Sequence, residues 1–391
     1  MPYIPFPVDR GTYQRVYHLF VELSKAFDVD LVCLQEDSSR SMEPFVSCTS
    51  RRLAIPFQNA PWQKLIPDRL LNPLPTTVQH WQVDGVAGAL REFVKGQNYD
   101  RVIFIDLVLW PYIKELFPEH PAIVMDRSRV DWLFQTEELK TLKLGLRERL
   151  LRKENLHKIA KLEREAYEAV AGMIVCGLDD RTFLQNKLGK SEKVFVLANG
   201  YNEVFFDAKQ HPRQLTDQPS FLFCGALDYS PNVDAIDWFA DEIWPRIHRE
   251  MPEAIWRIIG KSPDARSVRW GKLDGVELVG EVPDVRPYYQ SSWAQVVPLR
   301  IGGGTRLKIV ESLGMRCPVV STTIGAQGLD LPPGESILLV DDARGFAETV
   351  VCLLRDADLR QHLEANGVEV VQQNYRWEQL GQKLTTYLEE L

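Results

Sequence analysis

The sequence lacks the segments that would carry a chain out of the cytosol or across a membrane. Its first residues form no charged and apolar leader, and no run reaches about 18 apolar residues. Its six cysteines include no C-x-x-C pair and lie mostly in apolar runs, as buried, reduced thiols do. We therefore expect a cytoplasmic protein with no membrane span, no metal site and no cofactor.

Low-complexity tracts and internal repeats are also missing, and the composition, 45% hydrophobic and 26% charged, is typical of a globular protein. A length of 391 residues is too great for one ordinary core, so two domains are expected. The net charge is −8, with the acidic excess in the second half. Such a chain is a poor nucleic-acid binder, and we expect no nucleic-acid partner.

Short apolar runs alternate with helical periods throughout the chain, which predicts an α/β fold with two doubly wound, parallel sheets in tandem, joined near residue 200. The strands expected in the first half are 29–34, 101–106, 122–126, 172–176 and 194–197, and its helices 13–27, 76–95 and 130–169. The strands expected in the second half are 220–225, 254–260, 276–280, 294–298, 318–321 and 337–340. A turn at residues 5–11 comes so early that the usual first strand is expected to be very short or missing.

The most informative segment is 298–321, which passes from a strand through three consecutive glycines (302–304) into a helix expected from Thr305. Glycines let a ligand approach the backbone, and the amino end of a helix suits a diphosphate. Lys308 and Glu311 are expected on one side of that helix. Alternatively, the glycines form an ordinary surface turn and Glu311 is a solvated residue.

Several segments in the right order resemble the glycosyltransferase family 4 (group 1) enzymes, and more narrowly the sugar transferases of exopolysaccharide gene clusters. The matching segments are 223–239, 258–264, 276–288, 298–321 and 375–378, with weaker matches at 11–19, 146–165 and 197–202. The resemblance implies the GT-B fold, two Rossmann-like domains with a cleft between them. Residues 1–200 would bind the acceptor, residues 201–373 the nucleotide sugar, and a final helix at 374–391 would return to the first domain.

The resemblance also implies roles for individual residues. Glu311 matches the second glutamate of the family's E-x7-E motif, which accepts hydrogen bonds from the donor ribose. Thr305 and its neighbours match amides that hold the diphosphate, Gly280 the strip that holds the base, and Gly11 a loop that closes over the phosphates. The full set of expected donor-binding residues is Gly11, Gly225, Lys261, Gly280, Arg300, Gly303, Gly304, Thr305, Arg306, Lys308 and Glu311.

The sequence departs from the family pattern in two places. The first glutamate of E-x7-E falls at Gly303, and the usual cations after the first strand of the second domain fall near Ala226 and Asn232. A diphosphate in a closed cleft needs its charge offset. We therefore expect substitute cations, namely Arg300, Arg306 and Lys308.

On the acceptor side, Asp126 and Asp106 end two expected strands, where ligands of such sheets bind. We predict catalytic roles for Asp126 and Glu311. Either aspartate could instead be structural and cap the following turn.

The stretch 140–164 is basic and has leucines at helical spacing. Its cations are Lys140, Lys143, Arg147, Arg149, Arg152, Lys153, Lys158, Lys161 and Arg164. It is expected to be a solvated helix packed on the sheet or, alternatively, a surface that meets an anionic membrane carrying a lipid-linked acceptor.

By this resemblance, we expect a retaining glycosyltransferase of the hexosyltransferase type. It would move a sugar from a nucleotide diphosphate sugar, UDP- or GDP-linked, to a glycan or lipid-linked acceptor in polysaccharide or glycoconjugate biosynthesis. Two alternatives remain open at this point. One is a catalytically silent nucleotide-binding module that regulates a partner, and the other is a nucleotide-sugar epimerase of the same fold.

Overall fold

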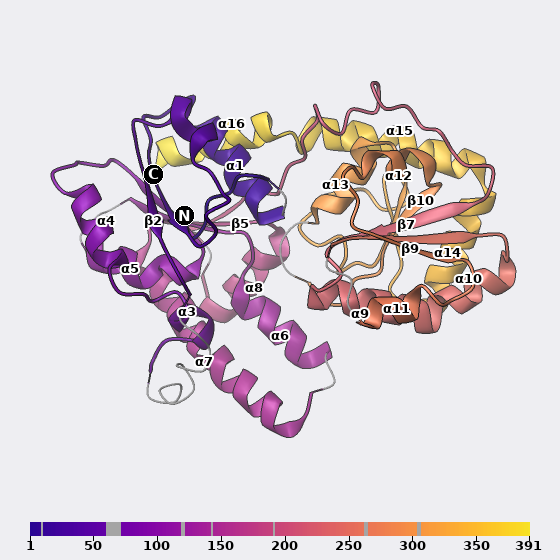
Figure 1. Ribbon diagram of the computed structural model, residues 1–391, viewed down its shortest axis with the longest axis horizontal. Helices are drawn as coiled ribbons and strands as arrows, with labels where there is room; N and C mark the ends of the chain where they lie inside the picture. The colour runs from indigo at the N-terminus through magenta and orange to yellow at the C-terminus, as the bar shows by residue number, and fades with distance from the viewer. Residues whose placement is uncertain are drawn as a thin grey trace. The chain divides into compact units, whose positions relative to one another are not determined.

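A computed structural model describes residues 1–8, 11–59, 72–118, 122–141, 144–190, 192–261, 265–302 and 306–391. The chain forms two compact units, which are described separately below (Figure 1). The N-terminal unit contains residues 1–198 and 377–391, and the C-terminal unit contains residues 199–376. The N-terminal unit is therefore built from both ends of the chain.

The main sheet of the N-terminal unit has four parallel strands in the order β3-β4-β5-β6. The strands are β3 (Val102–Ile105), β4 (Ile123–Arg127), β5 (Gly172–Val175) and β6 (Val194–Val196). Every residue of β4 and β5 is buried, because helices cover both faces of a parallel sheet. This double burial is why these strands appear in the sequence as continuous apolar runs.

A second, smaller sheet of the N-terminal unit pairs β1 (Asp30–Gln35) with β2 (Arg51–Pro56) in parallel. The chain start runs along the other edge of β1, where the Met1 amino group donates to the Val32 carbonyl oxygen at 2.6 Å and the Leu34 amide donates to Met1 at 3.0 Å. These contacts occupy the place where a first strand was expected to be short or missing.

The helices of the N-terminal unit are shorter than the expected ones in two places. The expected helix 76–95 is two helices, with Gly85 at a left-handed φ of 88° before the second, and the expected helix 130–169 is also two. The helices are α1 (Gly11–Leu23), α3 (Thr76–Gln79), α4 (Val86–Val94), α5 (Trp110–Leu116), α6 (Asp131–Thr141), α7 (Leu146–Ala169), α8 (Leu178–Leu188) and α16 (Trp377–Glu390), with 3-10 turns at η1 (Glu43–Cys48) and η2 (Leu107–Leu109).

Helix α16, from the end of the chain, packs along α1 at the start of the chain. The Trp377 and His18 rings stack with centroids 5.2 Å apart, and a β-carbon on Gly381 would lie 2.2 Å from the Glu22 side chain. Only glycine permits this close approach of the two helices.

A buried ion pair joins α1 to the main sheet of the N-terminal unit. The Arg15 guanidinium donates from Nη2 to Asp126 Oδ1 at 2.8 Å and from Nε to both carboxylate oxygens at 3.2 Å. Its Nη1 donates to the Leu197 carbonyl oxygen at 2.9 Å, so one side chain links α1, β4 and the segment after β6. Both partners are almost fully buried, so each neutralises a charge that water cannot reach.

The C-terminal unit is built on one six-stranded parallel sheet in the order β12-β11-β10-β7-β8-β9. The strands are β7 (Ser220–Cys224), β8 (Ile255–Ile259), β9 (Val276–Gly280), β10 (Ala294–Val297), β11 (Val319–Ser321) and β12 (Leu338–Leu339). Numbered from β7, this is the 3-2-1-4-5-6 order of a doubly wound sheet. The predicted pair of doubly wound, parallel α/β sheets is confirmed.

Helices cover both faces of this sheet, with α12, α13 and α15 on one side and α9, α10 and α14 on the other (Figure 1). Their bounds are α9 (Ser230–Trp238), α10 (Trp244–Glu250), α11 (Ala265–Trp270), α12 (Arg286–Ser291), α13 (Leu307–Gly314), α14 (Ala343–Arg355) and α15 (Ala357–Asn374), with a π turn at η3 (Phe239–Ile243) between α9 and α10. All six cysteines are free, and Cys352 on α14 is exposed, contrary to the expectation of a buried thiol.

We predict that Arg15→Met lowers the free energy of unfolding of the N-terminal unit by about 3 kcal/mol or more, because it leaves the Asp126 carboxylate buried without a partner. Urea denaturation of the full chain measures this change. The double variant Arg15→Met/Asp126→Leu should recover much of the loss. The matched control Arg51→Met removes a more exposed pair with Asp30 and should cost about 1 kcal/mol or less. A loss no larger than that of the control would contradict the prediction.

Candidate functional site

The carboxyl ends of β7 and β10 form the switch point of the C-terminal sheet. The two strands lie side by side, and the chain leaves β7 toward β8 on one side and β10 toward β11 on the other. Crossovers that diverge in this way leave a crevice at the strand ends, where doubly wound sheets bind ligands. The turn after β7 and the segment between β10 and α13 therefore carry the candidate site.

The turn after β7 is built around Gly225. A β-carbon at this position would lie 2.6 Å from the Lys308 Nζ atom and 2.7 Å from the Asn232 Nδ2 atom, so any larger residue would displace both side chains. The Asn232 amide donates to the Ala226 carbonyl oxygen at 2.8 Å and accepts from Lys308 Nζ at 3.0 Å. Gly225 thus leaves room for a lysine from α13 to reach the turn from across the switch point.

Lys308 and Glu311 lie one turn apart on α13, both half-buried, while the helix buries its other residues. The Lys308 ammonium lies 4.5 Å from the centroid of the Phe223 ring, on β7. Burial lowers the pKa of Lys308 to about 8, and Glu311 is close enough to oppose that shift. Burial likewise raises the pKa of Cys224, at the end of β7, to about 11. The structure therefore brings Gly225, Lys308 and Glu311 together, as the sequence suggested.

The other two expected phosphate cations are engaged with the protein itself. Arg300 makes a bidentate ion pair with Asp234 of α9, at 3.0 and 2.7 Å, and its guanidinium lies 5.2 Å from the centroid of the Trp238 ring. Arg306 donates to the Ile301 carbonyl oxygen at 3.1 Å. The Arg300 contacts fix the segment after β10 to α9, and the Asp234 carboxylate already offsets its charge.

Two more expected donor-binding residues follow neighbouring strands. Gly280 ends β9 with a left-handed φ of 79° and open space beside it, and its carbonyl oxygen accepts from the Gly260 amide at 2.8 Å. Lys261, after β8, is exposed and lies 3.5 Å from Glu281. Both residues lie at the carboxyl edge of the sheet, on the β8 side of the switch point.

Three of the expected donor-binding residues, Gly303, Gly304 and Thr305, lie outside the described residues. Helix α13 begins at Leu307 and not at Thr305 as expected, because Arg306 has an extended backbone with φ −87° and ψ 91°. Gly302 packs closely, since a β-carbon there would lie 2.0 Å from the Gln327 amide oxygen. Gly11 is the exposed first residue of α1, in the N-terminal unit.

At the carboxyl edge of the N-terminal sheet, the two candidate aspartates have different surroundings. Both oxygens of Asp126 accept hydrogen bonds from Arg15, and its side chain is buried, which favours the structural alternative for this residue. Asp106 is only half-buried, and a φ of 65° with ψ 153° places it in a strained region of the backbone map. Strain of this kind is concentrated at functional sites.

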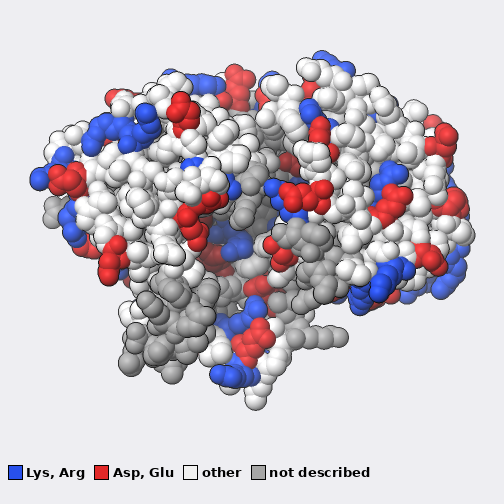
Figure 2. All heavy atoms as spheres, in the orientation of Figure 1, with Lys and Arg blue, Asp and Glu red and all other residues white. Residues whose placement is uncertain are grey.

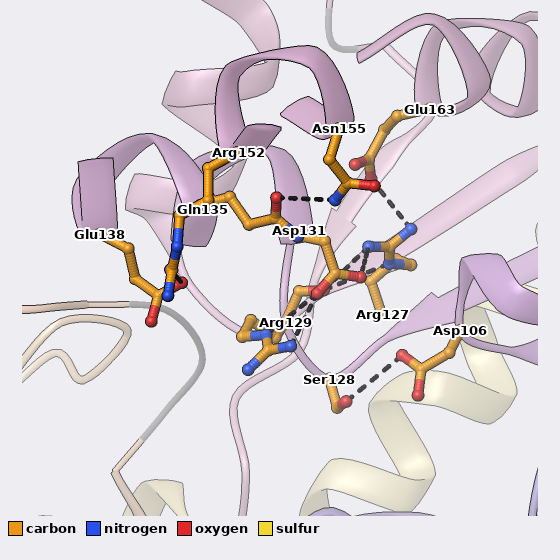
Figure 3. Close-up of polar contacts among 10 residues, drawn as sticks. All are labelled: Asp106, Arg127, Ser128, Arg129, Asp131, Gln135, Glu138, Arg152, Asn155 and Glu163. Atoms are coloured by element: carbon orange, nitrogen blue, oxygen red, sulfur yellow. Dashed lines mark hydrogen bonds and ion pairs between the residues drawn. The ribbon is translucent and has the colours of Figure 1, made fainter. Parts of the chain in front are cut away.

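A network of charged side chains lies on one side of Asp106 (Figure 3). Its Oδ1 atom accepts from the Ser128 hydroxyl at 3.5 Å, and its other oxygen points away from the residues drawn. Burial raises the pKa of Asp106 to about 6, although Arg127 opposes the shift. Arg127 pairs at 3.1 Å with Glu163 of α7, and both side chains are fully buried. These ion pairs link the end of β4 to α6 and α7, beside Ser128.

Sequence reasoning missed several of these contacts. Arg15 was not identified as the partner of Asp126, because the two residues are far apart in the chain and the weak match at 11–19 assigns no role to Arg15. The Arg127–Glu163 pair was missed for the same reason. The strain at Asp106 has no sequence signal beyond a non-glycine residue at a strand end.

Residues 218–356 match the family described as glycosyl transferases group 1. One curated protein, "Uncharacterized 44.6 kDa protein in cps region" of Klebsiella pneumoniae, is 24% identical over 162 residues. That segment spans 39% of this chain and 42% of the relative, less than half of either.

Solved structures match nearly the whole chain at low identity. Sucrose-phosphate synthase from Thermosynechococcus elongatus has a TM-score of 0.72 with 18% identity, covering 97% of this chain and 93% of that one. Anabaena Alr3699/HepE in complex with UDP and glucose has a TM-score of 0.64 with 13% identity, covering 96% and 95%. A glycosyltransferase from Rickettsia africae has a TM-score of 0.66 with 10% identity, covering 97% and 95%.

These likenesses establish the fold of the whole chain, and the family match falls on the unit that holds the switch point. Residues 218–356 thus match the group 1 (GT4) glycosyl transferase family, and the two parallel α/β sheets of the chain have the fold of GT-B structures.

Proposed function

We propose that the protein is a retaining glycosyltransferase that moves a sugar, a hexose by resemblance, from a UDP- or GDP-sugar to a saccharide or lipid-linked acceptor. The observation that carries the proposal is the convergence of Gly225, Lys308 and Glu311 at the switch point of the C-terminal sheet. A glycine turn, a cation and a carboxylate are what a diphosphate joined to a ribose requires. The Klebsiella cps-region relative supports a role in polysaccharide or glycoconjugate biosynthesis.

In this proposal the donor is bound by the C-terminal unit. The Lys308 ammonium lies at the turn where the diphosphate would rest, and Glu311, one helical turn further along α13, would accept hydrogen bonds from the ribose hydroxyls. Positive charge at the leaving diphosphate lowers the barrier as the bond from the anomeric carbon to the phosphate oxygen breaks. Chemistry of this kind depends on a preorganised charge and needs no strong side-chain nucleophile.

A panel of UDP- and GDP-sugars distinguishes the proposal from its two alternatives. We expect slow release of UDP or GDP and free sugar, with water as the acceptor. Formation of an epimer would instead identify an epimerase, and binding without turnover a silent module.

Glu311→Ala should weaken binding of the donor about tenfold, because it removes charge-assisted hydrogen bonds to the ribose. Isothermal titration with UDP or GDP measures this change, and an unchanged affinity would contradict the assigned role.

On the acceptor side, we propose Asp106 rather than Asp126 as the carboxylate that binds the attacking hydroxyl. Asp106 is half-buried with one oxygen turned away from its network, whereas both oxygens of Asp126 are held by Arg15. A carboxylate whose pKa is about 6 is ionised at neutral pH, so it can accept the hydrogen bond of an acceptor hydroxyl and orient its oxygen for attack.

The pH profile of donor hydrolysis tests Asp106, with water in place of the acceptor. Because burial raises the pKa of Asp106 to about 6, the rate should fall as the pH drops below 6 and the carboxylate is protonated. Asp106→Asn should lower the rate at pH 7.5 about a hundredfold and abolish this acidic limb. The matched control Asp100→Asn, at the exposed amino end of β3, should keep the wild-type profile. An acidic limb that persists in Asp106→Asn would contradict the role.

We further propose that the exposed side of α7 binds an anionic lipid surface, where a lipid-linked acceptor would be reached. Among the described residues, no helix is long and apolar enough to cross a membrane. All of residues 146–151 are exposed, including Leu146 at 78% and Leu150 at 59%. Two such leucines facing water at the start of a helix can insert into the lipid interface.

The same side of α7 becomes cationic beyond these leucines. Exposed residues follow one another along this side of α7 at spacings of three and four. They are Leu146, Leu150, Lys153, His157, Lys161 and Arg164. The neighbouring acids Glu148 and Glu154 are paired within the helix, with Arg152 and Lys158. On the face drawn in Figure 2, acidic and basic side chains are interspersed, so that face offers no general basic surface. The proposed lipid contact therefore rests on this side of α7 alone.

Sedimentation with vesicles tests this contact. We expect binding to phosphatidylcholine vesicles that contain phosphatidylglycerol and little binding to phosphatidylcholine alone. Lys153→Glu/Lys161→Glu and Leu146→Glu/Leu150→Glu should each weaken binding about tenfold or more. The control Val204→Glu, at an exposed apolar residue of the C-terminal unit, should bind as the wild type does. Equal sedimentation with both vesicle types would refute the contact.

A further inference from the structure

The helix that follows the turn at Gly225 brings no cation to the switch point. Residues 225–238, which form the turn and α9, include no lysine or arginine. A diphosphate bound against this turn would therefore need a positive charge from another element, since burying its charge without a counter-charge is costly. This inference rests on the proposed function, which places a nucleoside diphosphate at the switch point.

Lys308 reaches the turn from α13, on the other side of the switch point. Its Nζ atom donates to Asn232 Oδ1 at 3.0 Å and lies 2.6 Å from the position that a β-carbon on Gly225 would take. The ring of Phe223, 4.5 Å away at its centroid, covers another side of the ammonium. The hydrogen-bond partner and the ring partner are both neutral, and the Glu311 carboxylate one turn along α13 is a neighbouring negative charge.

Arg300, the other candidate cation on the β10 side, has a negatively charged partner. Its guanidinium is bound in bidentate fashion by the Asp234 carboxylate, at 2.7 and 3.0 Å. Freeing it for a phosphate would break two charge-assisted hydrogen bonds and leave Asp234, whose side chain is largely buried, without its partner. Lys308 would lose only one hydrogen bond to an amide.

We propose that the Lys308 ammonium, delivered across the switch point to the Gly225 turn and oriented by Asn232, is the principal cation that binds the donor's diphosphate. Arg300 instead fixes the segment after β10 to α9. The glycine at 225 is then required for two reasons, since it leaves room for both the lysine and the phosphate oxygens.

This arrangement makes donor binding sensitive to pH in a defined direction. Burial lowers the pKa of Lys308 to about 8; Arg306 acts in the same direction, and Cys224 of β7 and Glu311 of α13 oppose the shift. The ammonium is therefore present at pH 7 and mostly neutral at pH 9. The affinity for UDP or GDP should therefore fall by several-fold to about tenfold between pH 7 and pH 9. An arginine at 308 stays charged over this range, so the change should be absent from Lys308→Arg.

Isothermal titration with UDP and GDP at pH 7 tests the assignment. Lys308→Met should weaken binding about tenfold or more, while Lys308→Arg should retain most of it. The control Lys272→Met, at an exposed lysine of the same unit, should bind as the wild type does. Thermal unfolding of each variant checks that the C-terminal unit is folded.

The exchange variant Asn232→Lys/Lys308→Asn gives the sharpest test. It places the ammonium on α9 and the amide on α13, and the two side chains lie 3.0 Å apart in the wild type. If the position of the charge determines binding, the affinity for UDP or GDP should be within a few-fold of wild type. Asn232→Lys alone would place two ammonium groups together and does not serve as the rescue.

The outcomes separate this inference from the function on which it rests. If the wild type binds neither UDP nor GDP, the proposed function fails and the inference falls with it. If the wild type binds but folded Lys308→Met binds equally well, the inference alone is overturned. A loss in Arg300→Met as large as that in Lys308→Met, with the fold intact, would also overturn it.

Discussion

The order of the strands in the C-terminal sheet is the constraint on which the candidate donor site depends. Right-handed crossovers that start at β7 and at β10 leave in opposite directions, so the switch point, where doubly wound sheets bind ligands, lies between their carboxyl ends. Gly225 and Lys308 are far apart in the sequence, yet this topology brings them into contact. Lys308 and Glu311 can act on the same ligand only because the strand order places them at one edge of the sheet.

Much of this fold could be predicted from the sequence, because strands buried on both faces appear as apolar runs. Every strand of the C-terminal sheet was identified in this way. Strand β2 was missed, because it begins with Arg51 and Arg52, ends at Pro56 and is buried mainly at one position. The early break before α4 was missed because it depends on the left-handed backbone of Gly85, which no periodicity shows.

The candidate site could be predicted in part only. The glycine segment and α13 pointed to the edge of the sheet where Gly225, Lys308 and Glu311 lie together, but Arg300, Arg306 and Lys308 could not be ranked from the sequence. What distinguishes Arg300 from Lys308 is the nearest partner, a carboxylate for one and an amide for the other. Such pairings join residues of different elements, and they depend on helix rotation and burial that a single sequence does not specify.

Because α16 packs on α1, the N-terminal unit needs the last residues of the chain to cover its first helix. During synthesis on the ribosome, residues 199–376 are all made before that helix, so one side of α1 stays uncovered until the end of translation. A stalled or truncated chain would expose that surface to chaperones and proteases, although residues 199–376 had already been made.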